Sequence, residues 1–228
     1  ERHQIPPCDL LPRPHRRTTP SIYSAAEITR LLRAAHEMRS RTSQGLRFRR
    51  ATYETFFGLV AATGLRVGEA IRLDRSDIDW ANQLLIIRKS KFGKSREVVL
   101  NDSVVRALRR YAKERDCRHP RPRSPSFFVS RVGTRLIYNN VHSTFARLLR
   151  QAGIPRAKAR VHDLRHTFIV RTILRWYREG VDVDARMPLL STYVGHRNPS
   201  STYWYISATP ELMELVARKV ERALGALS

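Results

Sequence analysis

The 228-residue sequence predicts an α+β protein, mainly helical with a small antiparallel β-hairpin sheet. Most segments place apolar residues three and four positions apart between helix-capping residues, which is typical of amphipathic helices. Two short runs, "LLIIRKS" and "REVVL", are separated by "KFGK", which is a hairpin signal. With 42% hydrophobic residues and no visible internal repeat, the chain can bury one substantial core.

The first elements of the chain are predicted from residues that typically begin or end a helix or a linker. Residues 1–20 hold five of the 12 prolines and predict an extended basic linker or arm. Ser24 and Glu27 have capping-box spacing, so a helix is expected directly after Ser24. A mostly apolar second helix over 49–64 closes at a glycine, and a third begins at Arg66. One domain is expected over 21–228.

The later elements follow the same signals. Strands are predicted at 84–90 and 96–100, then a helix over 101–116 with Asn101 or Asp102 as its cap. Three more helices are predicted over 139–153, 161–180 and 210–228. The last of these places its apolar side chains on one face: Leu212, Leu215, Val216, Val220 and Leu224.

The charge of the chain indicates its partner. Lys and Arg number 43 against 20 Asp and Glu, giving a formal net charge of +23 and a pI near 11.3. Nucleic acid phosphate is the first candidate and an anionic membrane surface the second. No apolar run approaches the ~20 residues that span a bilayer, and no signal-peptide pattern opens the chain. With two cysteines, Cys8 and Cys117, a reducing cytoplasm is the expected setting.

Breaking a DNA backbone without a metal requires fixed cations at the phosphate oxygens, an in-line nucleophile and an acid for the leaving oxygen. Arginine suits the first task, because its planar fork is permanently charged. The sequence offers Arg66 in "TGLRVGEAIRL" and lysines in "RKSKFGKSR". In "HDLRH", His162, Arg165 and His166 share one helical face. "VGHRNPSSTYWY" adds a histidine and two tyrosines.

These five elements, in this order and spacing, resemble the catalytic domain of the tyrosine recombinase (phage-type integrase) family from about Ser21 to Ser228. The resemblance implies that Arg66 and Arg165 clamp the scissile phosphate. It also implies that Lys91 protonates the leaving 5′ oxygen, although the hairpin leaves the choice among its three lysines open.

The resemblance assigns the remaining catalytic roles. His162 matches the histidine that assists proton transfer, and His196 matches a position that bonds the phosphate. Tyr205, nine residues after His196, matches the nucleophile. Tyr203 falls at seven and is expected in the same helical turn, packed against the domain. His166 is expected to steady its helix. Four side chains are candidate DNA contacts: Lys89, Lys94, Arg96 and Arg197.

The family resemblance further implies strand exchange through a 3′-phosphotyrosyl intermediate and a Holliday junction, with no cofactor and no metal. The implied partners are double-stranded DNA sites and three further copies of the chain, with no membrane. An N-terminal DNA-clamping domain is implied but absent here, and because residue 1 is Glu the chain is expected to be a fragment or a processed product. The setting is the bacterial cytoplasm. The last helix, from about Pro210, either docks on a neighbouring protomer or packs on its own core.

Three alternatives stay open from the residues alone. A type IB topoisomerase uses the same chemistry to relax one strand. His162 and His166 at i and i+4 have the outline of a zinc hydrolase motif, but no convincing third-ligand motif follows. A DNA-binding module with an inactive site is the third.

Overall fold

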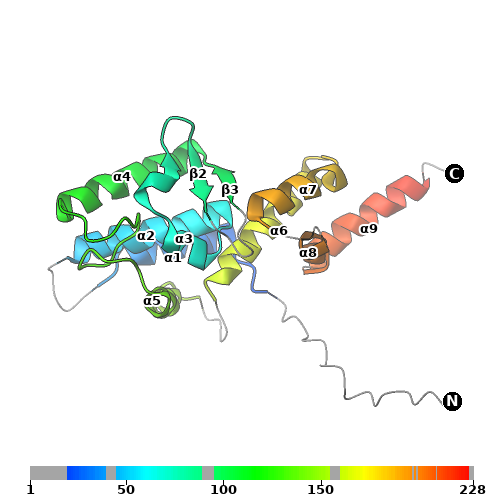
Figure 1. Cartoon of the computed structure of the whole chain (residues 1–228). Coiled ribbons are helices and arrows are strands. Elements are labelled where there is room, and N and C mark those ends of the chain that lie inside the picture. Colours follow the sequence, from blue (N-terminus) through cyan, green and yellow to red (C-terminus); the bar gives the residue numbers. More distant parts are fainter. Residues whose placement is uncertain are drawn as a thin grey trace, which may run out of the picture.

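The computed structural model describes residues 20–39, 45–88, 95–154, 160–196, 198, 200–208 and 210–225. Within these residues the chain is mainly helical with one three-stranded antiparallel sheet, which confirms the predicted α+β class. Nearly all of the predicted N-terminal arm lies outside the described residues. Figure 1 shows the helices α1 to α5 and the sheet gathered in one body, with α7, α8 and α9 to its right, next to α6.

The first three helices begin and end close to where the sequence predicts. They are α1 (Ala25–His36), α2 (Leu46–Thr63) and α3 (Val67–Arg72). The capping box at α1 is confirmed, because the Ser24 hydroxyl accepts from the Glu27 N–H and the Glu27 carboxylate accepts from the Ser24 N–H. The second helix starts three residues earlier than predicted.

The sheet contains the predicted hairpin and one strand that was not predicted. Strand β2 (Leu84–Ile87) pairs antiparallel with β3 (Arg96–Val99), and β1 (Ile78–Asp79) pairs with the other edge of β2. Leu85 and Val98 lie opposite each other in the register and are fully buried. The two-residue β1 is too short to show a period of two, so pattern reasoning could not detect it.

Three predicted helices follow the sheet: α4 (Asp102–Arg118), α5 (Tyr138–Gln151) and α6 (His162–Arg178). Of the two candidate caps for α4, Asn101 is the one used, because its side chain accepts from the Val104 N–H at 3.0 Å.

The sequence analysis missed α7 (Val183–Val194). Pro188 lies inside it, and an internal proline removes a helical hydrogen bond and argues against a helix. The helix is capped at its start, where the Asp182 side chain accepts from the N–H groups of Asp184 and Ala185. The hydrogen bonds of this cap and the burial of one face outweigh the proline.

The chain ends in three short-to-medium helical elements. They are α8 (Ser200–Tyr203), the 3₁₀ helix η2 (Trp204–Ala208) and α9 (Pro210–Gly225). A second 3₁₀ turn, η1 (Arg75–Asp77), precedes the sheet. Leu212 buries the start of α9 against the second core described below, and the rest of α9 extends away from the body in Figure 1.

Two buried clusters meet along α6. The first cluster lies among α1 to α5 and the sheet, and α6 reaches it through Leu164. The second lies among α6, α7, η2 and the start of α9, and α6 reaches it through Ile169, Val170 and Ile173. The N-terminal half of α6 therefore lies where the two cores join, and this is where the "HDLRH" residues begin.

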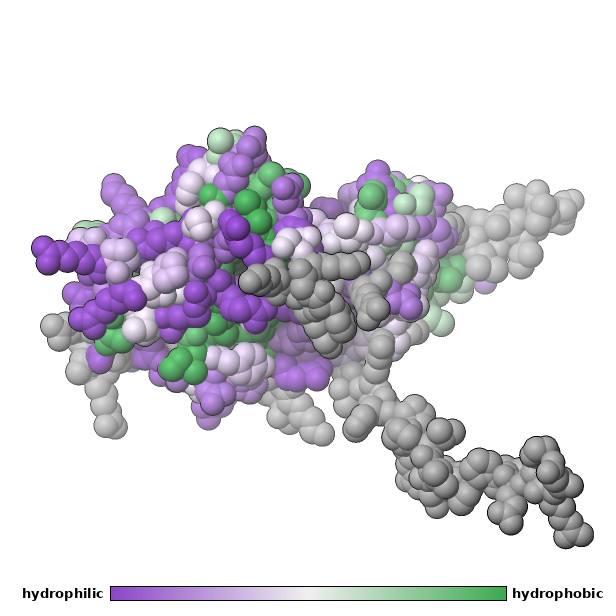
Figure 2. All heavy atoms as spheres, viewed as in Figure 1, coloured by the Kyte–Doolittle hydropathy of each residue, from purple (hydrophilic) through white to green (hydrophobic). Residues whose placement is uncertain are grey.

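The surface is largely polar. Hydrophilic residues cover most of the face shown in Figure 2, interrupted by small hydrophobic patches. Among the described helices, none is both long enough and apolar enough to cross a membrane.

Replacing Gly64, which ends α2, by alanine should destabilise the domain. Gly64 closes α2 with φ +64°, and an added Cβ would lie 2.5 Å from Phe168 Cδ1. Gly153 has a similar φ of +63° but nothing within 4 Å of an added Cβ. Gly153→Ala should therefore lower the free energy of unfolding by about 1 kcal/mol, and Gly64→Ala by roughly 2–3 kcal/mol. Urea denaturation measures both, and equal losses would contradict the Phe168 contact.

Candidate active site

Arg66 connects the end of α2 to the end of α7. It is the N-cap residue of α3, and its own backbone N–H donates to Glu69 Oε2 at 3.0 Å. Its guanidinium donates through Nη1 to Glu69 Oε1 at 2.8 Å and through Nη2 to the Gly195 carbonyl at 2.7 Å. The Arg66 guanidinium is therefore held at Gly195, the residue that directly precedes His196 in the sequence.

Glu69 is the anchor of a second arginine as well. Arg96 on β3 donates both terminal nitrogens to the Glu69 carboxylate at 3.0 and 2.8 Å and its Nε to the Tyr193 carbonyl at 2.8 Å. The Glu69 side chain is only 1% exposed. Burial opposes its ionisation, but the hydrogen bonds and charge of Arg96, with those of Arg66, lower its pKa to about 2. Glu69 is therefore an anion at neutral pH.

Arg96, a candidate DNA contact from the sequence, is bonded within the protein in this structure. Its side chain is 9% exposed, and all three guanidinium nitrogens are hydrogen-bonded within the protein. Arg96 instead fixes the sheet edge and α7 around Glu69. Glu69 lies three residues after Arg66 and accepts hydrogen bonds from both Arg66 and Arg96.

Arg165 lies deeper than Arg66. It is 1% exposed, its Nη1 donates to the Gly64 carbonyl at 2.7 Å, and its buried Nη2 has no hydrogen-bond partner. Burial, followed by the charge of Arg66, lowers the Arg165 pKa to about 9, so it stays a cation at neutral pH. An unpartnered buried donor on a cation costs stability unless an anion completes it, which is the feature expected of a phosphate site.

His196 stands beside this cation pair. Its Nδ1 lies 2.7 Å from Thr202 Oγ1, which in turn lies 2.5 Å from Ser191 Oγ. Its ring stacks on Tyr205 with centroids 6.1 Å apart and planes 8° from parallel. Burial, followed by the charges of Arg165 and Arg66, lowers the His196 pKa to about 3. The neutral ring can donate one hydrogen bond to an anion without adding charge.

Tyr205 contacts α6 through His166, the second histidine of that helix. His166 Nδ1 lies 2.6 Å from the Tyr205 hydroxyl, and the Tyr205 side chain belongs to the second core, 4% exposed. His162 packs edge-to-face on His166, with centroids 4.6 Å apart at 88°. Burial is the largest cause of a pKa near 4 for both histidines. Sequence reasoning had no signal for the His166–Tyr205 contact, because it joins residues 39 apart.

The two tyrosines lie in the predicted helical turn, where α8 continues into η2. They face opposite ways, as residues two apart in a helix should. Tyr203 is 38% exposed, whereas Tyr205 is 4% exposed. The stacking on His196 and the hydrogen bond to His166 hold Tyr205 inward.

Four of the candidate site residues lie outside the described part of the chain: Lys89, Lys91, Lys94 and Arg197. The structure does place the strands that lead into the lysine-bearing turn. Ile87 and Arg96 are the last pair of the β2–β3 register, and Arg96 is bonded to Glu69. The strand ends that flank residues 89–94 therefore lie at the end of the sheet that is bonded to Glu69.

The zinc interpretation of His162 and His166 finds no support in the side-chain arrangement. Among the residues that the structure describes, no group of three or more His, Cys, Asp or Glu side chains is placed to hold a metal ion. Asp163, the acidic residue of "HDLRH", accepts instead from the Arg160 backbone N–H and guanidinium.

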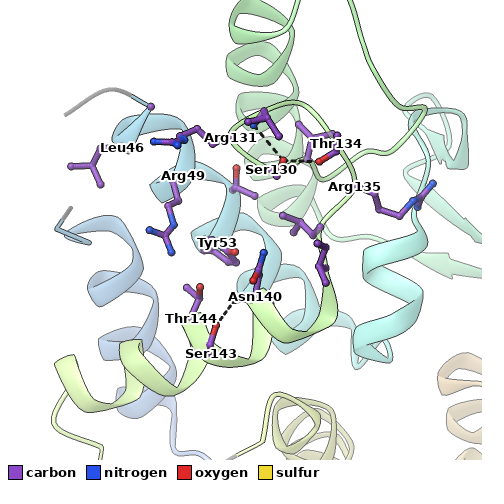
Figure 3. Close-up of a pocket in the computed structure, with 16 residues that line it drawn as sticks. Leu46, Arg49, Tyr53, Ser130, Arg131, Thr134, Arg135, Asn140, Ser143 and Thr144 are labelled. Atoms are coloured by element: carbon purple, nitrogen blue, oxygen red, sulfur yellow. Dashed lines mark hydrogen bonds between the residues drawn. The ribbon is translucent and has the colours of Figure 1, made fainter. Parts of the chain in front are cut away.

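A separate pocket of about 540 Å³ opens between α2, α5 and the loop before α5. In Figure 3, Arg49 and Tyr53 on α2 face Asn140 and Thr144 on α5, and Arg131 lies on the loop side. None of the candidate catalytic residues lines it. Its lining mixes apolar side chains with three arginines, Arg49, Arg131 and Arg135, so it can offer guanidinium groups to a ligand at a distance from the Arg66 site.

The comparisons with known proteins identify the family. Residues 23–211 match the phage integrase family, and the chain therefore belongs to the tyrosine recombinase (phage integrase) family of enzymes. It is 42% identical over 97% of its length to a protein of Sinorhizobium fredii named as an integrase/recombinase, y4rB, and covers 72% of it. It is 32% identical to the tyrosine recombinase XerD of Caulobacter vibrioides, covering 86% of this chain and 60% of that one.

The fold agrees with solved recombinases. The XerA recombinase superposes with a TM-score of 0.69 at 25% identity over 89% of this chain, which spans 66% of XerA. XerH, a site-specific recombinase captured with its difH substrate after cleavage, superposes with a TM-score of 0.68 over 90% of this chain and 54% of XerH. At 22% identity the XerH likeness shows the shared fold. The chain spans about half to two thirds of these structures.

Removing the Glu69 charge should unfold the arginine site. Glu69→Gln leaves Arg96 and the partly exposed Arg66 without their anion, so the free energy of unfolding should fall by roughly 3 kcal/mol. Urea denaturation at neutral pH is the measurement. Glu114→Gln is the matched control, because Glu114 pairs with Arg47, whose side chain is 92% exposed, and its loss should be less than about 1 kcal/mol. Equal effects would mean that Glu69 does not hold the site together.

Proposed function

We propose that this chain cuts and rejoins DNA strands at specific sites through a covalent 3′-phosphotyrosyl intermediate. The observation that supports this most directly is a pair of arginines, one of which has a buried N–H donor without a hydrogen-bond partner. Arg66 and Arg165 approach from α3 and α6, and the buried Nη2 of Arg165 has no partner. A tyrosine hydroxyl is held beside the neighbouring histidines. A phosphodiester anion would complete the arginine pair next to a nucleophile.

In the proposed reaction the guanidinium groups of Arg66 and Arg165 bind the non-bridging phosphate oxygens, and His196 donates a further hydrogen bond. The Tyr205 oxygen attacks phosphorus, and the bond from phosphorus to the 5′ oxygen breaks. Lys91 gives a proton to that departing oxygen, which leaves a free 5′-hydroxyl. A 5′-hydroxyl of the partner strand then attacks the phosphotyrosine and restores the backbone. Because the covalent link conserves the bond energy, rejoining needs no ATP.

Charge compensation also supports the phosphate assignment. Arg66, Arg96 and Arg165 place three cations around a single described carboxylate, Glu69, which is already bonded to two of them. A bound phosphodiester would oppose the mutual repulsion that lowers the Arg165 pKa. Binding energy would thus be gained where the transition state develops its charge.

The proposed partner is double-stranded DNA. The net charge of +23 favours a polyanion, and the arginines of the Figure 3 pocket, Arg49, Arg131 and Arg135, offer further guanidinium groups away from the reaction site. Arg49 lines this pocket, and Gly64, whose carbonyl is bonded to Arg165, marks the reaction site. The two residues are 15 positions apart along α2, or about 22 Å at 1.5 Å per residue, so one DNA duplex can contact both places.

Further parts of the proposal concern organisation. Residues 1–20 act as a basic arm and 21–228 as the catalytic domain, joined in the whole protein to a DNA-clamping domain. Four protomers assemble on two DNA sites in the bacterial cytoplasm and exchange strands through a Holliday junction. The amphipathic α9, which extends from the body, docks on a neighbouring protomer.

Tyr205→Phe should abolish the covalent protein–DNA adduct and leave DNA binding intact, because only the hydroxyl is removed. The measurement traps the adduct on a pool of nicked duplexes of randomised sequence and maps the DNA-linked peptide. Tyr203→Phe is the control, two residues away and exposed, and should still form the adduct. A link at Tyr203 or Tyr193, or an adduct that survives in Tyr205→Phe, contradicts the assignment.

Lys91→Ala should slow cleavage of ordinary DNA by at least about 100-fold, because an alkoxide leaves poorly without an acid. A substrate with sulfur at the bridging 5′ position should restore the rate, since a thiolate leaves without a proton. Arg66→Ala should gain nothing from the same substrate. Rescue of Lys89→Ala or Lys94→Ala instead would move the acid to that residue.

A further inference from the structure

The contact between His166 and Tyr205 is not explained by packing alone. His166 Nδ1 lies 2.6 Å from the Tyr205 hydroxyl, a short hydrogen bond for a nitrogen and an oxygen. The two ring centroids are 5.4 Å apart at 45°, so the rings are tilted and do not stack. The hydroxyl is the atom that attacks phosphorus in the proposed reaction, and His166 therefore touches a reacting atom.

The surroundings of His166 hold its ring in place. The His162 ring packs edge-to-face on it from the preceding turn of α6, and the Trp204 ring of η2 also contacts it, with centroids 6.4 Å apart. Leu164 and Thr167 of the same helix are buried. These two ring contacts and the hydrogen bond from Nδ1 to the Tyr205 hydroxyl restrict the orientation of the His166 ring.

The groups that act electrostatically on His166 favour its neutral form. Burial is the largest cause that lowers its pKa to about 4, and the positive charges of Arg160 and Arg165 add to it. His162 and His196 are the other titratable groups beside this cluster, and the pKa of each is also lowered by burial. At neutral pH the ring of His166 therefore keeps one nitrogen lone pair that can accept a proton.

We propose that His166 is the proton acceptor for the Tyr205 hydroxyl, with Nδ1 as the accepting atom. The proposal rests on the proposed function and names the residue that activates its nucleophile. As the bond from Tyr205 Oη to phosphorus forms, the hydroxyl proton moves to His166 Nδ1, while Lys91 supplies a different proton to the departing 5′ oxygen. On rejoining, the departing tyrosine oxygen takes its proton back from His166, so both residues return to their starting states.

In this proposal, binding of DNA raises the pKa of His166 and so makes it a better proton acceptor. The pKa of His166 is lowered partly by the cation Arg165, and a phosphodiester bound to Arg165 would offset that charge. The phosphate itself is an anion next to the ring and favours the imidazolium. His166 is thus neutral before DNA binds and a better base afterwards, when the proton must move.

The family resemblance gives proton transfer to His162, and the geometry divides the work differently. His162 supports the His166 ring through its edge-to-face contact, whereas the hydrogen bond to the hydroxyl comes from His166. We assign His162 to positioning. The two assignments predict different pH dependence, so they can be separated by experiment.

The test compares His166→Asn with the unaltered chain in single-turnover adduct formation from pH 6 to 9. An Asn side chain can place an amide group where Nδ1 lies and still accept a hydrogen bond, but it cannot take the proton. The probe is the pool of randomised nicked duplexes with sulfur at the bridging 5′ position, so that no acid step limits the rate. Adducts are quantified on denaturing gels and mapped to Tyr205.

The unaltered chain should show a nearly flat rate across this range. His166→Asn should be about 100-fold slower at pH 7 and should accelerate by about tenfold per pH unit, because the reaction then depends on ionisation of Tyr205 itself. The rates should converge as the pH rises. His162→Gln should keep the flat profile of the unaltered chain, whatever its rate.

Three results would overturn the assignment. A flat profile in His166→Asn means that the residue only orients the hydroxyl. Faster adduct formation in His166→Asn means that the contact restrains Tyr205. A tenfold-per-unit slope in His162→Gln alone makes His162 the base.

Two further measurements keep the outcome interpretable. Thermal melting checks that His166→Asn is folded, and His166→Gln is the second variant if it is not. Failure of the proposed function looks different, because the unaltered chain would then form no adduct at Tyr205 at any pH.

Discussion

The active-site region depends on one buried carboxylate. Glu69 receives Arg66 from its own helix turn and Arg96 from the sheet, and Arg96 reaches on to the Tyr193 carbonyl of α7. Three segments that are far apart in sequence are thus fixed by one anion whose pKa lies near 2. Because Glu69 neutralises only part of the surrounding positive charge, the site it holds together remains cationic, and a stabilising interaction also creates an anion-binding surface.

The position of α6 brings the arginine site next to Tyr205, the proposed nucleophile. Its first turns lie between the two cores, so Arg165 faces Gly64 and the arginine site while His166 faces η2. Rotation of about 100° between successive helical residues explains how adjacent residues serve two different partners. Burial of Tyr205 in the second core then brings its hydroxyl to the same helix that holds Arg165, the arginine proposed to bind phosphate.

Three neutral histidines complete the arrangement. Burial is the first cause of the low pKa of His162, His166 and His196, and nearby arginine charges add to it. Neutral imidazoles beside the arginines can donate to or accept from a substrate without increasing the repulsion between cations. The proposed division of roles follows from position: His196 lies beside Arg66, His166 touches the tyrosine, and His162 supports His166.

The sequence by itself determined the α+β class, most helices, the hairpin, the family and the order of its site residues, because these follow from local periodicity, capping and motif spacing. It did not reveal α7, since Pro188 opposes a helix locally and burial in the second core, together with the Asp182 cap, is needed to offset it. Nor could it show that Arg96 is bonded to Glu69, that Tyr205 is buried while Tyr203 is exposed, or that His166 is hydrogen-bonded to the Tyr205 hydroxyl. Each of these depends on contacts between distant segments, and the burial and charge that decide them exist only once the chain has folded.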